Sequence, residues 1–464
     1  MDDTVTGQVV EYLLSEKPID AKLRAKAIEH LTDGVAVMMA GSRSEATKKL
    51  IGYALTQTHD TTSTILGFLS KTSPEYAALI NGASGHADDY DDTQLASSPD
   101  RVYGLLTHPT VPVLASALAA GEYVSCTGAE LLEAYVAGFE VECKLAEAIN
   151  PQHYLRGFHT TGTIGAFGAA AASAKLMRLN EEETRYALGI TASLSSGIRA
   201  NFGTMTKPLH AGRAAANGLT ASILGKNGFT ADRDGLDERW GFLKVLGDGY
   251  SPEKILGKLG NPHSLLSPGA TIKMYPCGSL GQPSMDALLE VLQENDVNAQ
   301  EIKEIKLRAG PNILEPLRYT APTDYLQAKF SLQFGLASIA LRRKAGLREY
   351  TTEFVTSPST IEMMRRVKTM NDPEIAALGT DKMRSILEVE LHNGKTFRRP
   401  ADIARGTPEK PLAESDLRDK FRDCASFAYS QDEANNIYSK LKNIDKLSNI
   451  NELNQLLTTH AQGN

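Results

Sequence analysis

Thr163-Ile-Gly-Ala-Phe-Gly-Ala-Ala-Ala-Ala-Ser-Ala-Lys175 is a run of mostly small side chains near the middle of the chain. Glycine and alanine let neighbouring helices approach closely, so the run predicts a central, buried helix. The alternative is a membrane-spanning helix. The run is too short for that, and it ends at Lys175 and Arg178. The stretch therefore favours a core built from packed helices.

Helical periodicity extends over much of the chain around this run. Apolar residues recur at three- and four-residue spacing in segments 21–39, 127–149 and 181–195, the pattern of helices with one buried face. Thr127 with Glu130 three residues later fits a capping box at the start of the second segment. Residues 1 to about 265 are therefore predicted to be mostly helical.

The pattern changes after residue 268. Segments 301–309 and 386–397 alternate apolar and polar residues, which predicts half-buried strands, and Asn393-Gly394 is a hairpin signal. Helices are expected at 283–294 and 327–344. We predict a smaller α+β domain over 268–401. From about residue 412 the helical spacing returns, and this tail could dock on the first domain.

Composition limits the classes of function. The chain has 464 residues, with 49 basic and 56 acidic side chains and a net charge of -7. This balance argues against partners such as nucleic acid or a membrane surface. There is no uninterrupted run of 18 apolar residues and no basic-then-apolar signal pattern at the N-terminus. The four cysteines form no CxxC pair, so we expect a reducing, cytoplasmic location.

The segment His86-Ala-Asp-Asp-Tyr-Asp-Asp-Thr93, followed by His108-Pro109, concentrates acidic charge in apolar sequence. Clustered like charges must be offset by a metal, a cationic partner, a shared proton or solvation. Asp88 to Asp92 formally match the DDxxD pattern of Mg²⁺-dependent prenyl-diphosphate enzymes, but the second acidic motif of those enzymes is missing. Position six of an EF-hand loop would be Gln94 rather than glycine. A solvated loop stays open as the plainer interpretation.

His159 stands just before the small-residue helix. A helix N-terminus disfavours imidazolium and would keep this histidine available as a base. The alternative is that Thr160 or Thr161 caps the helix and His159 only forms structural hydrogen bonds.

Lys207 lies where a loop meets an alanine-rich helix. At that position a lysine can pair with an anionic ligand, although no Walker A motif is present and a solvated lysine is an equal alternative. Further along the chain, Tyr275-Pro276 predicts a rigid turn. Cys277 has no histidine beside it in the sequence that would suggest a nucleophile.

Taken in order, these segments resemble one family, MmgE/PrpD, which contains 2-methylcitrate dehydratase, cis-aconitate decarboxylase and iminodisuccinate epimerase. The matching pieces are His86-x-x-Asp-Tyr-Asp-Asp-Thr93, His108-Pro109, Gly157-Phe-His159, Gly203-Thr-Met-Thr-Lys-Pro-Leu-His210, Tyr275-Pro276 and Ala328-Lys-Phe-Ser-Leu-Gln-Phe334. Each piece alone is a weak signal, and the ordered set is specific.

The resemblance implies a mainly α fold. A large all-helical domain would be formed by both chain ends, residues 1–267 and 402–464, and the α+β part, 268–401, would be an inserted lid domain. It also implies a homodimer, no metal or organic cofactor, and a small di- or tricarboxylate substrate. The implied catalytic residues are Asp91, His108, His159, Lys207 and Tyr319. Thr204, Thr206, Lys273 and Gln282 are the expected substrate-binding residues.

One position departs from the family pattern. Cis-aconitate decarboxylases and many other members carry a histidine shortly after the Tyr-Pro or Phe-Pro turn, and this sequence has Gln282 there. Glutamine hydrogen-bonds a carboxylate but does not shuttle protons at neutral pH. Within the family, we expect a 2-methylcitrate dehydratase-like lyase. An epimerase or a decarboxylase is the alternative within the family. A Mg²⁺-dependent prenyl-diphosphate enzyme and an inactive carboxylate-binding homologue are the alternatives outside it. Asp91 is expected to orient one of the histidines.

Overall fold

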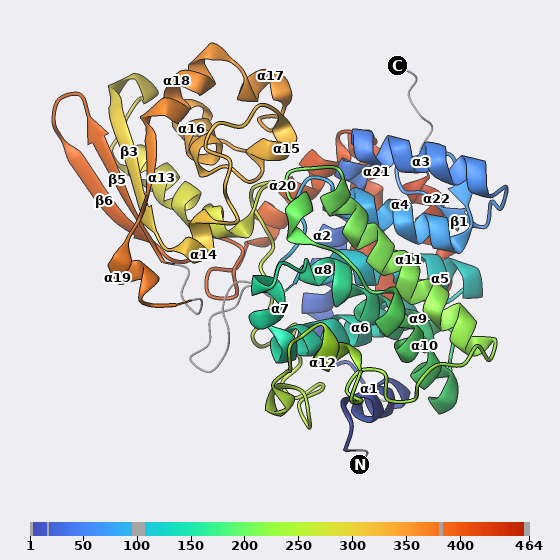
Figure 1. Cartoon of the computed structure of the whole chain (residues 1–464). Helices are drawn as coiled ribbons and strands as arrows, with labels where there is room; N and C mark the ends of the chain where they lie inside the picture. Colours follow the sequence, from blue (N-terminus) through green and yellow to red (C-terminus); the bar gives the residue numbers. More distant parts are fainter. Residues whose placement is uncertain (1–2, 16–17, 95–106, 380–383, 459–464) are drawn as a thin grey trace.

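The structure is a computed structural model that describes residues 3–15, 18–94, 107–379 and 384–458. Its larger part is helical and its smaller part combines helices with a four-stranded sheet, as Figure 1 shows. The predicted fold class is therefore confirmed. The domain boundaries at 267/268 and 401/402 stay a prediction.

Helix α9 (Gly165–Leu176) is the predicted small-residue helix and lies at the centre of the helical part. It packs against α5 (Thr110–Val124), α6 (Gly128–Ile149) and α11 (Thr206–Lys226), and every residue in it except Lys175 is buried. Helices approach it closely from two sides. A Cβ added to Gly138 of α6 would lie 2.5 Å from the carbonyl oxygen of Gly168, and one added to Gly218 of α11 would lie 2.4 Å from the amide nitrogen of Ala170. The small side chains are what permit this packing.

The other helices of the larger part surround this core. The capping box predicted at Thr127 and Glu130 is present at the start of α6. Among the described residues, the remaining α-helices before residue 250 are α1 (Val5–Leu14), α2 (Ala21–Gly41), α3 (Glu45–Gln57), α4 (Pro74–His86), α7 (Gln152–Leu155), α8 (Thr160–Thr163), α10 (Glu181–Leu194) and α12 (Phe242–Val245). A two-stranded ribbon, β1 (Ser63–Thr64) with β2 (Lys71–Thr72), lies beside α4.

The smaller part contains a sheet with strand order β4-β3-β5-β6. Its strands are β3 (Ile302–Ala309), β4 (Val367–Asn371), β5 (Ser385–Leu391) and β6 (Thr396–Ala401). The predicted hairpin joins β5 to β6, and Gly394 has the positive φ of 86° that such a turn needs. Strand β4 pairs with β3 in parallel and was not predicted from the sequence.

Helices separate this sheet from the larger part. Helix α13 (Gln282–Glu294) packs against β5 and β6, and α16 (Leu332–Arg342) packs against β4 and α13 (Figure 1). The shorter helices of this part are α14 (Pro311–Leu314), α15 (Tyr325–Ala328), α17 (Thr352–Val355), α18 (Pro358–Arg366) and α19 (Pro373–Ala376).

The C-terminal segment returns to the helical part, as predicted. It forms α20 (Glu414–Ala425), α21 (Gln431–Lys442) and α22 (Asn451–Leu457), of which α20 and α21 pack on α2 (Figure 1). Ile437 and Leu453 are fully buried in the same apolar cluster as Leu31 and Val35. Among the described residues, no helix is long and apolar enough to cross a membrane.

Candidate active site

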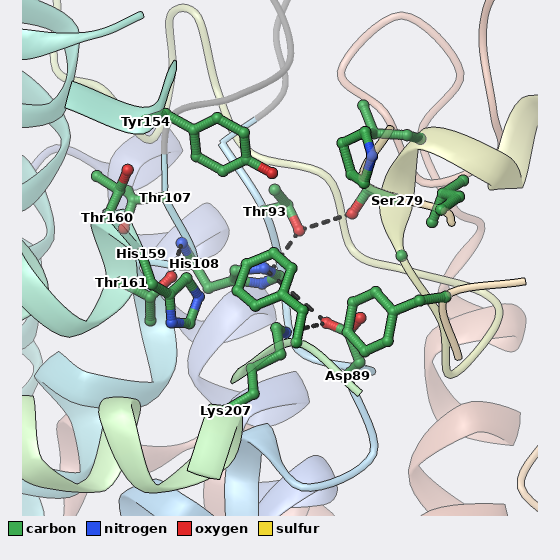
Figure 2. Close-up of a pocket in the computed structure, with 16 residues that line it drawn as sticks. Asp89, Thr93, Thr107, His108, Tyr154, His159, Thr160, Thr161, Lys207 and Ser279 are labelled. Carbon is green, nitrogen blue, oxygen red and sulfur yellow. Dashed lines mark hydrogen bonds and ion pairs between the residues drawn. The ribbon is translucent and has the colours of Figure 1, made fainter. Parts of the chain in front are cut away.

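A small cavity of about 70 Å³ lies between the helical part and the α+β part (Figure 2). Its helical side carries the polar groups and its α+β side is mostly apolar. The lining residues are Asp89, Thr93, Thr107, His108, Tyr154, His159, Thr160, Thr161, Phe202, Lys207, Gly278, Ser279, Leu280, Pro316, Leu317 and Phe330. The two sides meet at a hydrogen bond of 2.9 Å between the hydroxyl groups of Thr93 and Ser279.

The acidic segment begins where α4 ends at His86, and each of its carboxylates has protein partners. Asp88 accepts a hydrogen bond from Arg43 at 2.7 Å and lies 3.4 Å from Lys329. Asp92 lies 2.7 Å from His30 and accepts hydrogen bonds from the amide and hydroxyl groups of Thr110. Cations and hydrogen-bond donors of the protein therefore offset much of the clustered charge.

Asp89 lies between two lysines at the edge of the cavity. One of its carboxylate oxygens is 2.9 Å from the Nζ of Lys207 and 2.9 Å from the Nζ of Lys273. Burial alone raises the pKa of Asp89, but the two ammonium charges outweigh it and hold the pKa well below its usual value. Asp89 is therefore ionised, and its single negative charge is shared by two cations.

Asp91 does not line the cavity, but its carboxylate contacts His86 and also lies 3.5 Å from the Nδ1 of His108, which does. Its carboxylate lies 2.8 Å from the Nδ1 of His86, and the Nε2 of the same ring lies 2.8 Å from the Nζ of Lys207. Burial, followed by the charge of Lys207, lowers the pKa of His86 well below 6.5. A neutral His86 that donates from Nδ1 to Asp91 can accept from Lys207, so the three side chains form one chain of hydrogen bonds.

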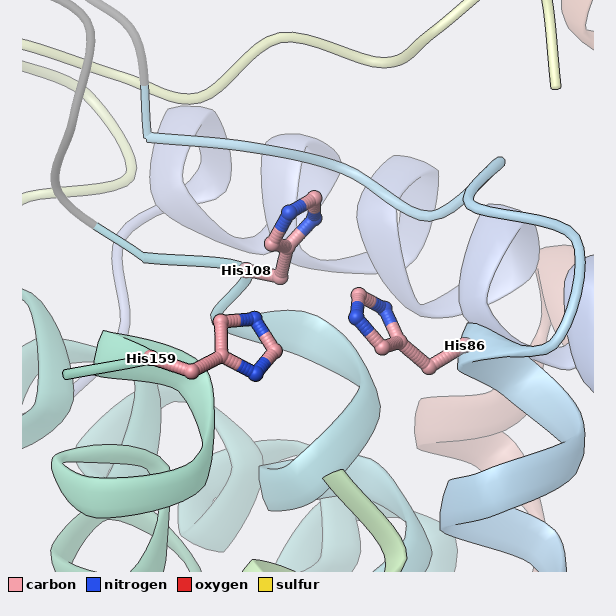
Figure 3. Close-up of side chains that lie close together, drawn as sticks. All are labelled: His86, His108 and His159. Atoms are coloured by element: carbon pink, nitrogen blue, oxygen red, sulfur yellow. The ribbon is translucent and has the colours of Figure 1, made fainter. Parts of the chain in front are cut away.

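His86 lies close to two further histidines, His108 and His159, and we call the three the imidazole cluster (Figure 3). The ring centroids of His86 and His108 are 4.7 Å apart, and those of His86 and His159 are 5.5 Å apart. Burial is the largest cause that lowers the pKa of all three rings well below 6.5. The cluster is therefore neutral near pH 7 and can accept protons.

His159 and His108 are positioned by short local contacts. His159 is the residue before α8, and its amide donates to the carbonyl of Gly197. The Nε2 of His159 is buried and has no hydrogen-bond partner among the described residues. The amide of His108 donates to the hydroxyl of Thr161, and its Nδ1 lies 3.0 Å from the carbonyl of Asp92.

The imidazole cluster also has the spacing of a metal site, since ligand atoms of its three rings lie within 4.8 Å of one another. Two observations make a cation a poor fit. The Nε2 of His86 already faces the ammonium of Lys207. A second ammonium, that of Lys273, contacts the Asp89 oxygen that Lys207 also contacts. A divalent ion would have to displace or deprotonate Lys207. The residues suit an anion better than a metal ion.

The structure brings together some of the residues expected from the sequence. Of these, His108, His159 and Lys207 line the cavity. Asp91 and Lys273 are fully buried one layer behind it, Asp91 against His86 and Lys273 against Asp89.

Four other expected residues do not line the cavity in this structure. The Tyr319 hydroxyl donates to the carbonyl of Phe202, and Thr204 is exposed and donates to the carbonyl of Asn201. Thr206 is half-buried at the first position of α11. Gln282 is buried, and its amide joins Met274, Tyr275 and Cys277 in the rigid turn.

Several cavity residues were missed from the sequence. Asp89, Thr93, Tyr154 and Ser279 line the cavity but were not selected as site residues, and neither was His86, which lies behind the cavity against Asp91. The spacing of His86 from Asp91 carried a signal, because α4 ends at His86 and the loop folds back on it. No sequence pattern marked Tyr154 or Ser279, because only the tertiary structure brings α7 and the turn after Tyr275-Pro276 to the cavity.

The fold and the cavity define a protein with a helical core and an α+β part that enclose a small, cation-bearing site. Comparison with known families agrees. Residues 8–255 match the MmgE/PrpD N-terminal domain, and residues 275–445 match the MmgE/PrpD C-terminal domain. The chain belongs to the MmgE/PrpD family, as the sequence motifs had indicated.

Several curated relatives that the chain matches over most of their length are cis-aconitate decarboxylases. The chain is 27% identical to the enzyme from Mus musculus, over 93% of this chain and 90% of the relative. It is 28% identical to the enzyme from Homo sapiens, over 83% of this chain and 79% of the relative. It is 24% identical to the enzyme from Aspergillus terreus, over 95% of this chain and 92% of the relative.

Proposed function

We propose that this protein is a cofactor-independent enzyme that acts on a small di- or tricarboxylate by proton transfer at a carbon next to a carboxylate. One observation carries the proposal: the ammonium of Lys207 and two neutral imidazoles, His108 and His159, face the same small cavity. A cation that binds a carboxylate and a base beside it are what this chemistry requires.

Lys207 is the proposed carboxylate-binding group. It shares the Asp89 carboxylate with Lys273, so one negative charge serves two buried cations. A substrate carboxylate would supply the missing negative charge. Hydroxyl groups of Thr93, Thr161 and Ser279 around the cavity can donate further hydrogen bonds to it.

His159 is the proposed base. When a proton leaves the carbon, negative charge builds on the adjacent carboxylate, and a well-placed cation stabilises that charge by ~3–4 kcal/mol. The Nε2 of His159 is buried and has no hydrogen-bond partner among the described residues, so no protein group competes for its lone pair; a positioned base contributes on the order of 10²–10⁴ in rate. His108 lies on the other side of the cluster and is the second candidate.

Dehydration is our preferred reaction. Loss of water needs a base at carbon and an acid for the leaving hydroxide. Lys207 can be that acid because burial lowers its pKa, although Asp89 opposes the shift. By the family resemblance, Gln282 stands where cis-aconitate decarboxylases are expected to carry a histidine, and its amide braces a turn instead of lining the cavity. This difference supports a reaction other than that of the relatives.

Decarboxylation is the second candidate, and the names of the relatives favour it. The apolar α+β wall of Leu280, Leu317 and Phe330 would destabilise a buried carboxylate as a charged group and so promote its loss as CO₂. The two reactions share the carboxylate-binding cation but differ in the proton transfer. Dehydration needs a base that removes a proton from carbon. Decarboxylation breaks the bond to CO₂ and leaves an electron pair on carbon that must receive a proton, which Lys207 can supply.

An NMR assay in D₂O tests the proposal. Purified protein is incubated with 2-methylcitrate, citrate, cis-aconitate and related acids, and deuterium entry at carbon, loss of water and loss of CO₂ are followed together. Deuterium exchange or an unsaturated product from a hydroxy acid supports a dehydratase. Loss of CO₂ from cis-aconitate supports a decarboxylase. Neither exchange nor product across the panel would overturn the proposal.

EDTA separates this proposal from a Mg²⁺-dependent prenyl-diphosphate enzyme. Dialysis against EDTA leaves a cofactor-independent enzyme active and removes the activity of the rival. On the family resemblance alone, we also propose a homodimer in the cytoplasm, which light scattering and fractionation would test.

A further inference from the structure

His210 lies outside the cavity but touches the proposed base. It is on α11, close to one turn after Lys207, and is 8% exposed. Its Nδ1 lies 3.0 Å from the Nδ1 of His159. Close backbone packing holds the ring there. A Cβ added to Gly162 would come within 3.0 Å of the His210 Cβ, and one added to Gly197 would come within 3.3 Å of its Cγ.

A contact between two Nδ1 atoms constrains both rings. Burial, followed by the charge of Lys207, lowers the pKa of His210 to about 4, and His159 also stays neutral near pH 7. A neutral imidazole carries its proton on one nitrogen only, so one Nδ1 must donate and the other must accept. The choice decides whether the Nε2 of His159 carries a proton or a lone pair.

The surroundings of His159 favour the lone pair at Nε2. The Nε2 of His159 has no hydrogen-bond partner among the described residues in either tautomer, so the missing partner alone does not choose between them and the nearby charge decides. After burial, Lys207 is the largest influence that lowers the pKa of His159. A positive charge nearby stabilises a lone pair and repels an N–H group.

We propose that His210 is a positioning residue that accepts a hydrogen bond from the Nδ1–H of His159 and thereby keeps the Nε2 of His159 unprotonated as the base. The assignment of that base rests on the proposed function, whereas the tautomer of His159 does not. His210 thus does for His159 what Asp91 does for His86, with a neutral acceptor in place of a carboxylate.

Two nearly isosteric substitutions test the assignment. His210→Asn keeps an oxygen acceptor close to the position of Nδ1, and His210→Leu fills similar space without any acceptor. Protein labelled with ¹⁵N-histidine is studied by two-bond ¹H–¹⁵N correlation, which distinguishes a protonated from an unprotonated ring nitrogen. Signals of His159 are assigned with His159→Gln.

The expected result is an Nδ1–H tautomer for His159 in the unsubstituted protein and in His210→Asn, and a shift toward the Nε2–H tautomer in His210→Leu. An Nε2–H tautomer in the unsubstituted protein would overturn the proposal, whether or not the protein is active. If the tautomer is as expected but no acid in the panel exchanges, the proposed function fails and the positioning role stands.

Kinetics give a second readout. Where a substrate is found, His210→Leu should lower kcat on the order of 10²-fold with little change in KM, because it removes base character and not a substrate contact. The fold reduction of kcat in His210→Asn should be less than about one tenth of the reduction in His210→Leu. Equal losses in the two variants, with both folded by circular dichroism, would count against a role in setting the tautomer.

Discussion

Asp89 and its two lysines give the sharpest stability prediction. At 2.9 Å and an effective dielectric constant of about 20, each Asp89–lysine attraction is about 6 kcal/mol before desolvation is counted. Removing one partner of a buried ion pair costs about 3–5 kcal/mol. Asp89→Asn leaves two buried ammonium groups without the carboxylate that they share, so its cost should lie at the upper end of this range. Lys273→Met leaves the Asp89–Lys207 pair intact and should fall at the lower end.

Urea unfolding at pH 7 measures both costs, and Lys420→Met serves as a matched control. Like Lys273, Lys420 is buried and paired, 2.7 Å from Asp33, but Asp33 does not line the cavity, whereas Asp89, the partner of Lys273, does. It should lose stability without the change in substrate KM expected for Lys273→Met. The double variant Asp89→Asn/Lys273→Met should cost at least about 1 kcal/mol less than the sum of the single costs. Additive costs, or a larger cost for Lys273→Met than for Asp89→Asn, would refute the reasoning.

Three further predictions follow from the same contacts. Asp91→Asn should reduce kcat on the order of 10²-fold, because the amide no longer orients His86 as a carboxylate does, and near-normal kcat across the pH range would disprove the pairing. The pKa values of the imidazole cluster are lowered in the folded protein, so below about pH 6.5 the unfolded chain binds more protons than the folded chain. The contribution of these histidines to the free energy of unfolding should be complete above about pH 6.5. Below that pH the free energy of unfolding should fall by up to about 1.4 kcal/mol per pH unit for each histidine. A urea midpoint that does not change between pH 7 and pH 5 would contradict this. Gln282→His should destabilise the protein by about 1–3 kcal/mol and should not add decarboxylation of cis-aconitate. A neutral imidazole has one N–H group, so it cannot accept from Met274 and donate to both Tyr275 and Cys277. An unchanged melting temperature would show that these contacts do not stabilise the turn.

Local patterns predicted most of the fold. The capping box at Thr127, the small-residue helix and the hairpin at Asn393-Gly394 each depend on residues close together in the chain, and all three are present. Strand β4 was missed because its pairing with β3 is long-range and parallel, and its five residues, Val367–Asn371, show no alternation strong enough to predict a strand.

The site was only partly predictable for the same reason. His108, His159 and Lys207 stand in recognisable motifs and do reach the cavity. Tyr319 and Gln282 also stand near motifs, but backbone carbonyl and amide groups nearby take up their polar atoms. Which polar side chain faces the cavity and which braces the backbone depends on the packing around it, and one sequence does not state that packing.

The amino-acid sequence by itself determined the helical core, the separate α+β part and the presence of histidines beside clustered acidic charge, because spacing and residue type act over a few neighbouring positions. Only the tertiary structure decided how that charge is offset. It places Lys207 from α11 and Lys273 from a distant turn on one oxygen of Asp89, and it sets His210 against His159. Electrostatic effects on pKa depend on distances of a few ångströms between residues far apart in the chain, and only folding fixes those distances.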